Sequence, residues 1–271
     1  MGTEGGARGA VWRAGSLAVG FIGGACAMLG LGGPSSSGQP VYRPTRDVHA
    51  QYIKYASGTD SITAYLAYPE RADPAPAVLV IHEIFGISDF VRSATEDLAK
   101  NGFVALAPDL LTRRGGTPAS PDSARRLIAS LNPDTITRDL NGAFAYLQSL
   151  KAVRASTIGV IGFCWGGGES FRYATNNPDL RAFVVCYGPA PKLADVGRIR
   201  AHGYGVYADR DVRINQELFN LASTLHDDHV QFHLKVYPGV SHGFLRTRDH
   251  PKQADEAWKA IFQFLHEEMG R

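Results

Sequence analysis

The feature that most constrains the fold is a glycine-rich turn at the end of an apolar run. TIGVIGF (157–163) reads as a buried strand, and the turn CWGGG leads directly into a segment with helical spacing. Gly162 and Gly166 flank Cys164 in a Gly-x-Cys-x-Gly pattern, which is typical of a strand that turns sharply into a helix. The central residue of such a turn has a strained backbone, so its close neighbours must be small. The stretch therefore predicts that Cys164 occupies the position of a nucleophile at the end of a strand.

The rest of the chain alternates between apolar runs and segments with helical spacing. This alternation favours an α/β fold, with a mostly parallel sheet and helices on both faces. Ahead of it, HAQYIKYA and SITAYLAYP alternate in polarity around residues 57–60, which predicts an N-terminal antiparallel hairpin. We expect a single domain over residues 45–271. The expected parallel strands are AVLVIH, FVALAP, TIGVIGF, RAFVVCYG, HGYGVYA and VQFHLKVYP, and the expected helices cover 89–101, 121–131, 134–150, 166–176, 214–227 and 253–268.

Composition limits the partners of this domain. The chain has 271 residues, of which 44% are hydrophobic, and this is enough for one well-buried core. Its formal net charge is +2 and it contains no long basic run. Neither a nucleic acid nor an anionic membrane surface is therefore an expected partner.

Residues 1–38 differ from the rest of the sequence. Arg8 and Arg13 precede the apolar, glycine-rich stretch AGSLAVGFIGGACAMLGLGG, and PSSSGQP follows it. A basic start, an apolar middle and small residues are typical of an export signal, with Ala25-Cys26-Ala27 as a cleavage site. An uncleaved anchor and a wrongly assigned start of the chain are the alternatives. We expect residues 1–38 to be a signal peptide or N-terminal anchor plus linker. The protein is then exported, to the periplasm or outside the cell, or otherwise membrane-tethered or cytoplasmic.

Two residues downstream of Cys164 are candidates for a proton relay. In folds with this turn, an acid and then a histidine follow the nucleophile along the chain. Asp211 follows HGYGVYA and His242 follows VQFHLKVYP, so both stand just past strand carboxyl ends, where open α/β sheets place their active sites. The histidine would relay the proton and the aspartate would hold its ring. Asp209 is the alternative acid, and we prefer Asp211 because it begins a helix ahead of the apolar Ile214.

The helix after the turn is expected to act on the sulfur. Its N-terminus aims free N–H groups and a positive dipole at Cys164, which is expected to lower the thiol pKa. The Trp165 N–H is expected to donate to the oxyanion of a tetrahedral intermediate. Cys186, in an apolar run, is interpreted as a core residue, and His82 as a core histidine with satisfied hydrogen bonds.

Five motifs together resemble the dienelactone hydrolase family, over nearly all of residues 46–271. They are HEIFG (82–86), PDLLTR (108–113), GFCWGG (162–167), ADRDVRIN (208–215) and YPGVSHGF (237–244). The resemblance implies an α/β-hydrolase fold and a triad formed by Cys164, Asp211 and His242.

The resemblance also implies roles for four other residues. Glu83 corresponds to the family's active-site glutamate beside the thiol, and a carboxylate there opposes thiolate formation until substrate arrives. The N–H of Ile84 corresponds to the second oxyanion donor. Arg113 and Arg246 correspond to the arginines that bind the substrate carboxylate, although Arg114 shares the loop of Arg113 and competes with it for this role.

These residues together lead to the expected function. We expect a monomeric, cysteine-dependent hydrolase that opens a small carboxylate-bearing lactone, of the dienelactone-to-maleylacetate type, through an acyl-thioester. This is a carboxymethylenebutenolidase-like activity, and its expected context is the degradation of aromatic compounds. A broader carboxylesterase and a non-catalytic binding protein are the alternatives. Neither a metal nor a cofactor is expected, and His226, His229 and His233 are interpreted as surface residues because they span a helix-to-strand junction.

Overall fold

The sheet begins with the expected antiparallel hairpin. In the computed structural model, which describes residues 47–270, β1 (Val48–Ser57) pairs with β2 (Asp60–Pro69) along its whole length. The turn between them places Gly58 at a φ of 63°, a conformation that glycine adopts without strain. β2 then pairs antiparallel with β4, which joins the hairpin to the rest of the sheet.

The remaining strands are parallel and complete an eight-stranded sheet in the order β1-β2-β4-β3-β5-β6-β7-β8. The central strands are buried on both faces, as expected of parallel strands covered by helices. The fold class predicted from the sequence is therefore confirmed. The parallel strands are β3 (Ala75–Ile81), β4 (Val104–Pro108), β5 (Val153–Phe163), β6 (Ala182–Cys186), β7 (His202–Ala208) and β8 (Phe232–Tyr237).

Local sequence fixes where several helices begin. α1 (Asp89–Lys100) is capped by the Ser88 hydroxyl, which accepts a hydrogen bond from the Val91 N–H. α2 (Pro121–Ala129) and α3 (Pro133–Ser149) each begin with a proline directly after a capping Ser120 or Asn132. The other helices are α4 (Trp165–Asn176), α5 (Val212–Asn215), α6 (Leu218–Asp227), α7 (Phe244–Thr247) and α8 (Pro251–Met269), with 3-10 turns η1 (Thr112–Arg114) and η2 (Leu193–Arg198).

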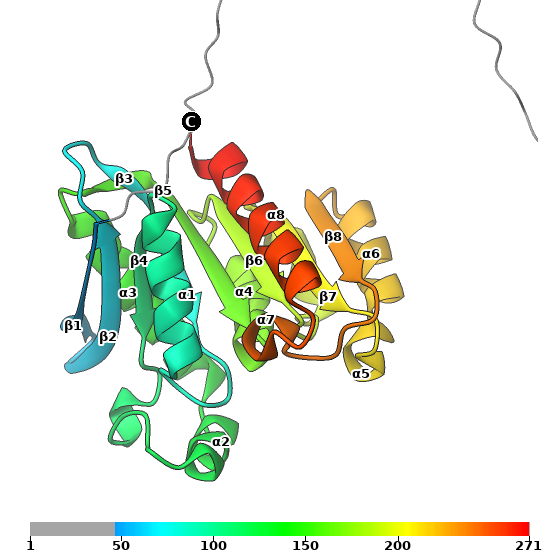
Figure 1. Cartoon of the computed structure of the whole chain (residues 1–271), viewed down its shortest axis with the longest axis horizontal. Helices are drawn as coiled ribbons and strands as arrows, with labels where there is room; N and C mark the ends of the chain where they lie inside the picture. The colour runs from blue at the N-terminus through cyan, green and yellow to red at the C-terminus, as the bar shows by residue number, and fades with distance from the viewer. Residues whose placement is uncertain (1–46, 271) are drawn as a thin grey trace, which may run out of the picture. The chain divides into compact units, whose positions relative to one another are not determined.

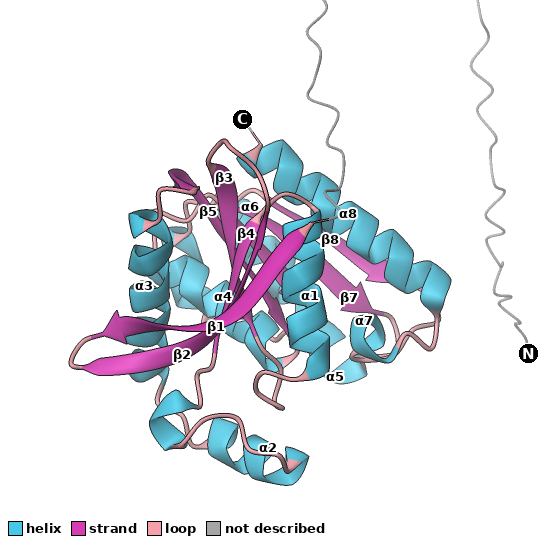
Figure 2. Cartoon of the chain, turned by 60° about the vertical axis from the view of Figure 1, so that its left-hand side comes forward, coloured by secondary structure: helices cyan, strands magenta, loops and turns pink. Residues whose placement is uncertain are grey.

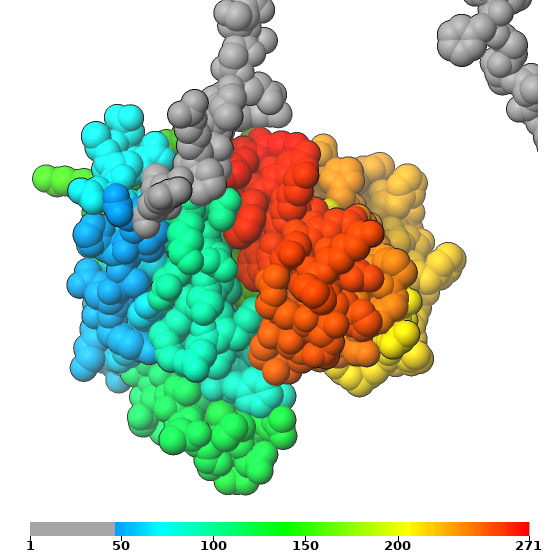
Figure 3. All heavy atoms as spheres, viewed as in Figure 1, coloured from blue at the N-terminus to red at the C-terminus, as the bar shows by residue number. Residues whose placement is uncertain are grey.

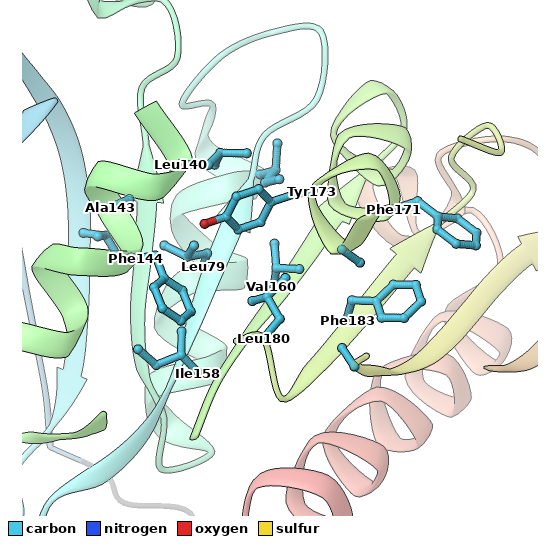
Figure 4. Packing of buried hydrophobic residues seen from close by; sticks show 14 of the residues in the cluster. Leu79, Leu140, Ala143, Phe144, Ile158, Val160, Phe171, Tyr173, Leu180 and Phe183 are labelled. Carbon is cyan, nitrogen blue, oxygen red and sulfur yellow. The ribbon is translucent and has the colours of Figure 1, made fainter. Parts of the chain in front are cut away.

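The helices cover both faces of the sheet (Figures 1 and 2). On one face α3, α4 and α6 pack against the strands, and Figure 4 shows Leu79, Val160, Phe144 and Tyr173 in contact there. On the other face α1 and α8 cover a second core that includes Cys186. Because both faces are occupied, the edge at the strand carboxyl ends is left for loops that carry function.

Three details differ from the expected elements. The predicted helix 214–227 is two helices, α5 and α6, and α7 and the two 3-10 turns were not predicted. The predicted signal or anchor at 1–38 and the predicted domain start at 45 lie outside the described residues. Within residues 47–270, no helix combines the length and the apolar character needed to cross a membrane.

Candidate active site

The turn between β5 and α4 places Cys164 in a strained backbone conformation. Its φ is 56° and its ψ is −118°, and it is the residue that directly precedes α4. A Cβ at Gly162 would overlap the Gly166 carbonyl, and a Cβ at Gly166 would overlap the carbonyl oxygens of Ile81 and His82. The Cys164 N–H donates to the Cys186 carbonyl at 3.0 Å, which ties the turn to β6. Because Gly162 and Gly166 have no Cβ, the turn can pack closely on itself and on the end of β3, while the hydrogen bond ties it to β6. These contacts hold Cys164 in place.

The thiol of Cys164 is half-buried, and its pKa is raised rather than lowered. Burial is the largest cause, and the Glu83 carboxylate adds to it. The Trp165 backbone N–H donates to the sulfur and acts in the opposite direction, as do the charges of Arg213 and Arg246. The helix N-terminus therefore acts on the thiol pKa in the expected direction, through the Trp165 N–H, but desolvation outweighs it and the net shift is upward.

His242 and Asp211 are brought together across neighbouring loops. Asp211 follows β7 and is 7% exposed, and its Oδ2 is hydrogen-bonded to Nδ1 of His242, which follows β8. The preferred acid is therefore the one in contact with the histidine. The alternative, Asp209, is exposed and accepts a hydrogen bond from the Gly239 N–H at 2.8 Å, so it stabilises the turn after β8 instead.

Glu83 follows β3 and is held in a buried position opposite Arg246. Nε of Arg246 lies 3.0 Å from Oε2 of Glu83, whose side chain is 2% exposed. The contact is an ion pair without hydrogen-bond geometry, and Oε2 has no hydrogen-bond partner. Burial raises the pKa of Glu83 from 4.5 to about 7, although Arg246 opposes the shift. Glu83 is thus a carboxyl group that changes charge near neutral pH.

Replacing Glu83 by glutamine is expected to remove a pH-dependent loss of stability. Because the carboxyl of Glu83 has a pKa of about 7 in the folded protein and 4.5 ordinarily, the folded state retains a proton between these values that the unfolded chain releases. Wild-type stability therefore falls as pH rises through this window. Glu83→Gln should be similar to wild type at pH 5 and more stable at pH 8 by about 1–3 kcal/mol, from roughly 1.4 kcal/mol per pKa unit.

Urea denaturation of wild type and Glu83→Gln at pH 5 and pH 8 measures this difference in the free energy of unfolding. Glu267→Gln is the matched control because Glu267 is exposed on α8. A difference between Glu83→Gln and wild type that stays constant across this pH range would contradict the prediction.

His82 is fully buried and organises the loop that carries Glu83. Its Nε2 accepts a hydrogen bond from the Leu110 N–H at 3.3 Å, so Nδ1 carries the proton and donates to the Glu83 carbonyl at 2.7 Å. Its ring stacks on Trp165 at 5.5 Å. The interpretation of His82 as a satisfied core histidine is confirmed, and so is that of Cys186, which is fully buried in the second core.

The two predicted oxyanion donors share one apolar cluster beneath α2. Ile84 and Trp165 are partly buried against Leu111 and against Ala124 and Ile128 on the inner side of α2. The cluster thus brings the loop after β3 and the turn after β5 to one place. Their roles as oxyanion donors remain predictions.

Arg113 lies in an ion-pair network of its own. Its Nε and Nη2 donate to the buried carboxylate of Asp139, its Nη1 to Asp60, and its Nη2 also to the Ser57 carbonyl. These contacts tie the loop after β4 to the hairpin and to α3. In this structure the substrate role predicted for Arg113 is not supported, because every nitrogen of its guanidinium already donates to another group.

A cavity of about 190 Å³ lies beside Arg113, and Arg114 also lines it. Neither Cys164 nor His242 contributes to its walls. The walls of this cavity thus come from the loop after β4 and from α3 and the turn before it. The other lining residues are Leu110, Leu131, Asn132, Thr135, Ile136, Arg138 and Asp139.

Tyr187 is a residue of the site that the sequence analysis missed. It follows β6, has a φ of 40° and is fully buried. Its ring lies edge-on to His242, with centroids 5.1 Å apart, and its hydroxyl has no hydrogen-bond partner. The only signal in the sequence is a Tyr-Gly pair directly after a buried strand, which is too common to single out.

The part of the chain from 47 to 270 holds no group of three or more His, Cys, Asp or Glu side chains placed to bind a metal ion. The residues at the strand ends are instead Cys164, the hydrogen-bonded pair of His242 and Asp211, and the ion pair of the buried Glu83 with Arg246.

Solved structures with low sequence identity share this architecture. An acylaminoacyl peptidase from Pyrococcus horikoshii aligns with a TM-score of 0.69 at 14% identity, over 84% of this chain and 43% of the peptidase. With the strand order and the position of the turn, this likeness defines the fold as that of an α/β hydrolase.

The family follows from the sequence. Residues 62–269 match the Dienelactone hydrolase family, and the chain belongs to it. Proteins named "Putative carboxymethylenebutenolidase" are similar: one from Synechocystis sp. is 29% identical over 83% of this chain and 99% of its own length, and one from Saccharolobus solfataricus is 30% identical over 79% and 96%. A crystal structure named as a putative dienelactone hydrolase from Klebsiella pneumoniae has a TM-score of 0.75 at 26% identity, covering 81% of this chain and 98% of that one. The chain is therefore a hydrolase that acts on ester or lactone bonds.

Proposed function

We propose that this protein is a cysteine-dependent hydrolase that opens small carboxylate-bearing lactones of the dienelactone type through an acyl-thioester. One observation carries the proposal: the cysteine at the strained turn after β5 shares the strand-end edge with the hydrogen-bonded pair of His242 and Asp211. A nucleophile followed by an oriented imidazole is the arrangement that acyl transfer requires.

In the proposed reaction, the thiol proton of Cys164 passes to His242 while the sulfur attacks the ring carbonyl. The Ile84 and Trp165 N–H groups donate to the oxyanion that forms. The ring C–O bond then breaks, and the enolate oxygen that leaves takes the proton. In the second half, His242 removes a proton from water, hydroxide attacks the thioester and the released sulfur regains the proton. The net change is addition of one water to the lactone.

The resting state of the site is consistent with substrate-triggered activation. The raised pKa of the Cys164 thiol keeps it neutral and weakly nucleophilic. Arg246, 38% exposed beside the buried Glu83, is the cation that a substrate carboxylate reaches first. Occupation of Arg246 by substrate would weaken its hold on Glu83 and allow that side chain to move away from the sulfur.

The test is turnover of cis-dienelactone and of the neutral ester 4-nitrophenyl butyrate by the purified protein. We expect opening of the lactone with a kcat/KM at least about tenfold higher than for the ester, because a bound carboxylate adds a charge-assisted contact. Comparable or faster hydrolysis of the neutral ester would instead identify a broader carboxylesterase. The contacts of Arg113 favour this second candidate function, the carboxylesterase. Arg113 is paired with Asp139, so of the two predicted arginines only Arg246 is paired with Glu83.

We also propose that residues 1–38 are an export signal or an anchor with a linker, and that the protein is a monomer. The basic start and apolar stretch of the sequence support the first statement. N-terminal sequencing of the mature protein tests it, since an intact Met1 in an exported fraction would exclude cleavage. The molar mass measured by light scattering tests the second.

A further inference from the structure

Phe85 contacts two arginines from different parts of the chain. The guanidinium carbon of Arg246 lies 5.4 Å from the centre of the Phe85 ring, and that of Arg125, on α2, lies 5.1 Å from it. Both distances are typical of cation–π contacts. Phe85 is half-buried and directly follows Glu83 and Ile84 in the loop after β3. One aromatic ring thus brings a second cation toward the arginine that faces Glu83.

The packing of α2 explains why Arg125 reaches this ring. Ala124 and Ile128 fix the inner side of the helix against the cluster that contains Ile84 and Trp165. Arg125 adjoins Ala124, so the same contact that places α2 over the predicted oxyanion donors brings Arg125 to Phe85. Figure 3 shows this green segment projecting at the lower edge of the described domain, where it is open to solvent.

The charge of Arg125 is available to a ligand. Its ion-pair partner is Asp122, with Nη1 3.3 Å from Oδ1, and the two side chains are 52% and 75% exposed. Pairs this exposed contribute little free energy, so a ligand carboxylate can replace Asp122 at low cost. Arg113, in contrast, is bound to the buried carboxylate of Asp139. Of these two arginines, Arg125 is therefore the one that can exchange its carboxylate partner for that of a ligand.

We propose that Arg125 is a specificity-determining residue, which binds the carboxylate of the substrate together with Arg246 at the Phe85 ring, in place of Arg113. The inference rests on the proposed function, because it assigns the second cation of the same site. α2 is then the element that selects anionic over neutral esters, and Phe85 is the platform that spaces the two guanidinium groups.

The first experiment compares 4-acetoxybenzoate with its methyl ester, which differ in one negative charge. We expect Arg125→Ala to lower the ratio of kcat/KM for the anionic over the neutral ester about tenfold, mainly through a higher KM for the anion. Arg126→Ala is the matched control, since Arg126 is exposed on the same helix and its side chain donates to Ser123. Its ratio should stay within about twofold of wild type. A similar drop in both variants would overturn the proposal, because the effect would then be one of net charge.

A binding measurement separates this inference from the proposed function. Calorimetric titration with 4-hydroxybenzoate requires no turnover, and we expect Arg125→Ala to raise the Kd about fivefold while Arg126→Ala leaves it unchanged. If wild type opens no cis-dienelactone and hydrolyses neither ester, the proposed function fails, and the titration still decides the role of Arg125. Absence of binding to wild type, or weakening by Arg113→Ala and not by Arg125→Ala, would overturn the inference.

Discussion

Cys164→Ala is expected to lower kcat/KM by at least about 10³-fold, the scale of loss when the nucleophile of a triad enzyme is removed. The reason is chemical: in the proposed reaction the sulfur forms the covalent intermediate, and His242 and Asp211 act only through it. Residual hydrolysis would come from substrate binding and the backbone N–H groups near the turn. Initial rates with cis-dienelactone and with an aryl ester measure the effect.

Folding should be preserved in this variant. Alanine retains a Cβ and therefore the strain of a φ of 56°, and it removes a half-buried sulfur rather than a core side chain. We expect the free energy of unfolding to change by less than about 1 kcal/mol, the usual range away from packed cores. Cys164→Ser, which keeps a hydroxyl in place, is also expected to be nearly inactive because the surroundings keep this side chain neutral and serine is a weaker nucleophile than cysteine.

Cys186→Ala is the matched control for Cys164→Ala. Cys186 is fully buried one strand away, and its carbonyl, which the substitution retains, accepts the hydrogen bond from the Cys164 N–H. We expect this variant to keep its activity within about twofold and to lose roughly 1 kcal/mol of stability through the lost packing. Within residues 47–270, iodoacetamide should label wild type and Cys186→Ala once and should not label Cys164→Ala. Full activity of Cys164→Ala would exclude a cysteine nucleophile.

The position of the candidate site could be predicted because strand ends determine it. Parallel strands place their carboxyl ends at one edge of a sheet, so residues just past apolar runs meet there whatever their separation in sequence. Glu83, Cys164, Asp211 and His242 each follow a different strand of this sheet. The order of the strands was not needed to infer that these residues meet at one edge.

Two other properties of the site depend on tertiary contacts that the sequence does not display. Arg113 is engaged by Asp139 and Asp60, which are 26 and 53 residues away along the chain. The direction of the thiol pKa depends on how deeply Cys164 is buried, and a helix N-terminus alone suggests the opposite direction. The same reason explains why the sequence did not point to Arg125. Its contact with Phe85 exists only once α2 packs on the cluster around Ile84.

Asp211→Asn is expected to lower kcat by about 10²–10⁴-fold, the upper value being that of the same substitution in a serine triad. Asparagine preserves the shape of the side chain but removes the negative charge that stabilises protonated His242, and it can present an N–H₂ group to Nδ1. The imidazole then favours the tautomer in which the nitrogen facing the nucleophile carries the proton and cannot accept another. KM should change little, because neither group is proposed to contact the substrate carboxylate.

Asp209→Asn distinguishes this effect from a general loss of charge after β7. Asp209 is two residues away, and its Oδ2 accepts a hydrogen bond from the Gly239 N–H, which the amide oxygen of asparagine can also accept. We expect its kcat to stay within about threefold of wild type. If Asp209→Asn were the inactive variant, Asp209 would be the acid that supports His242 in catalysis. The hydrogen bond between Asp211 and His242 would then have only a structural role.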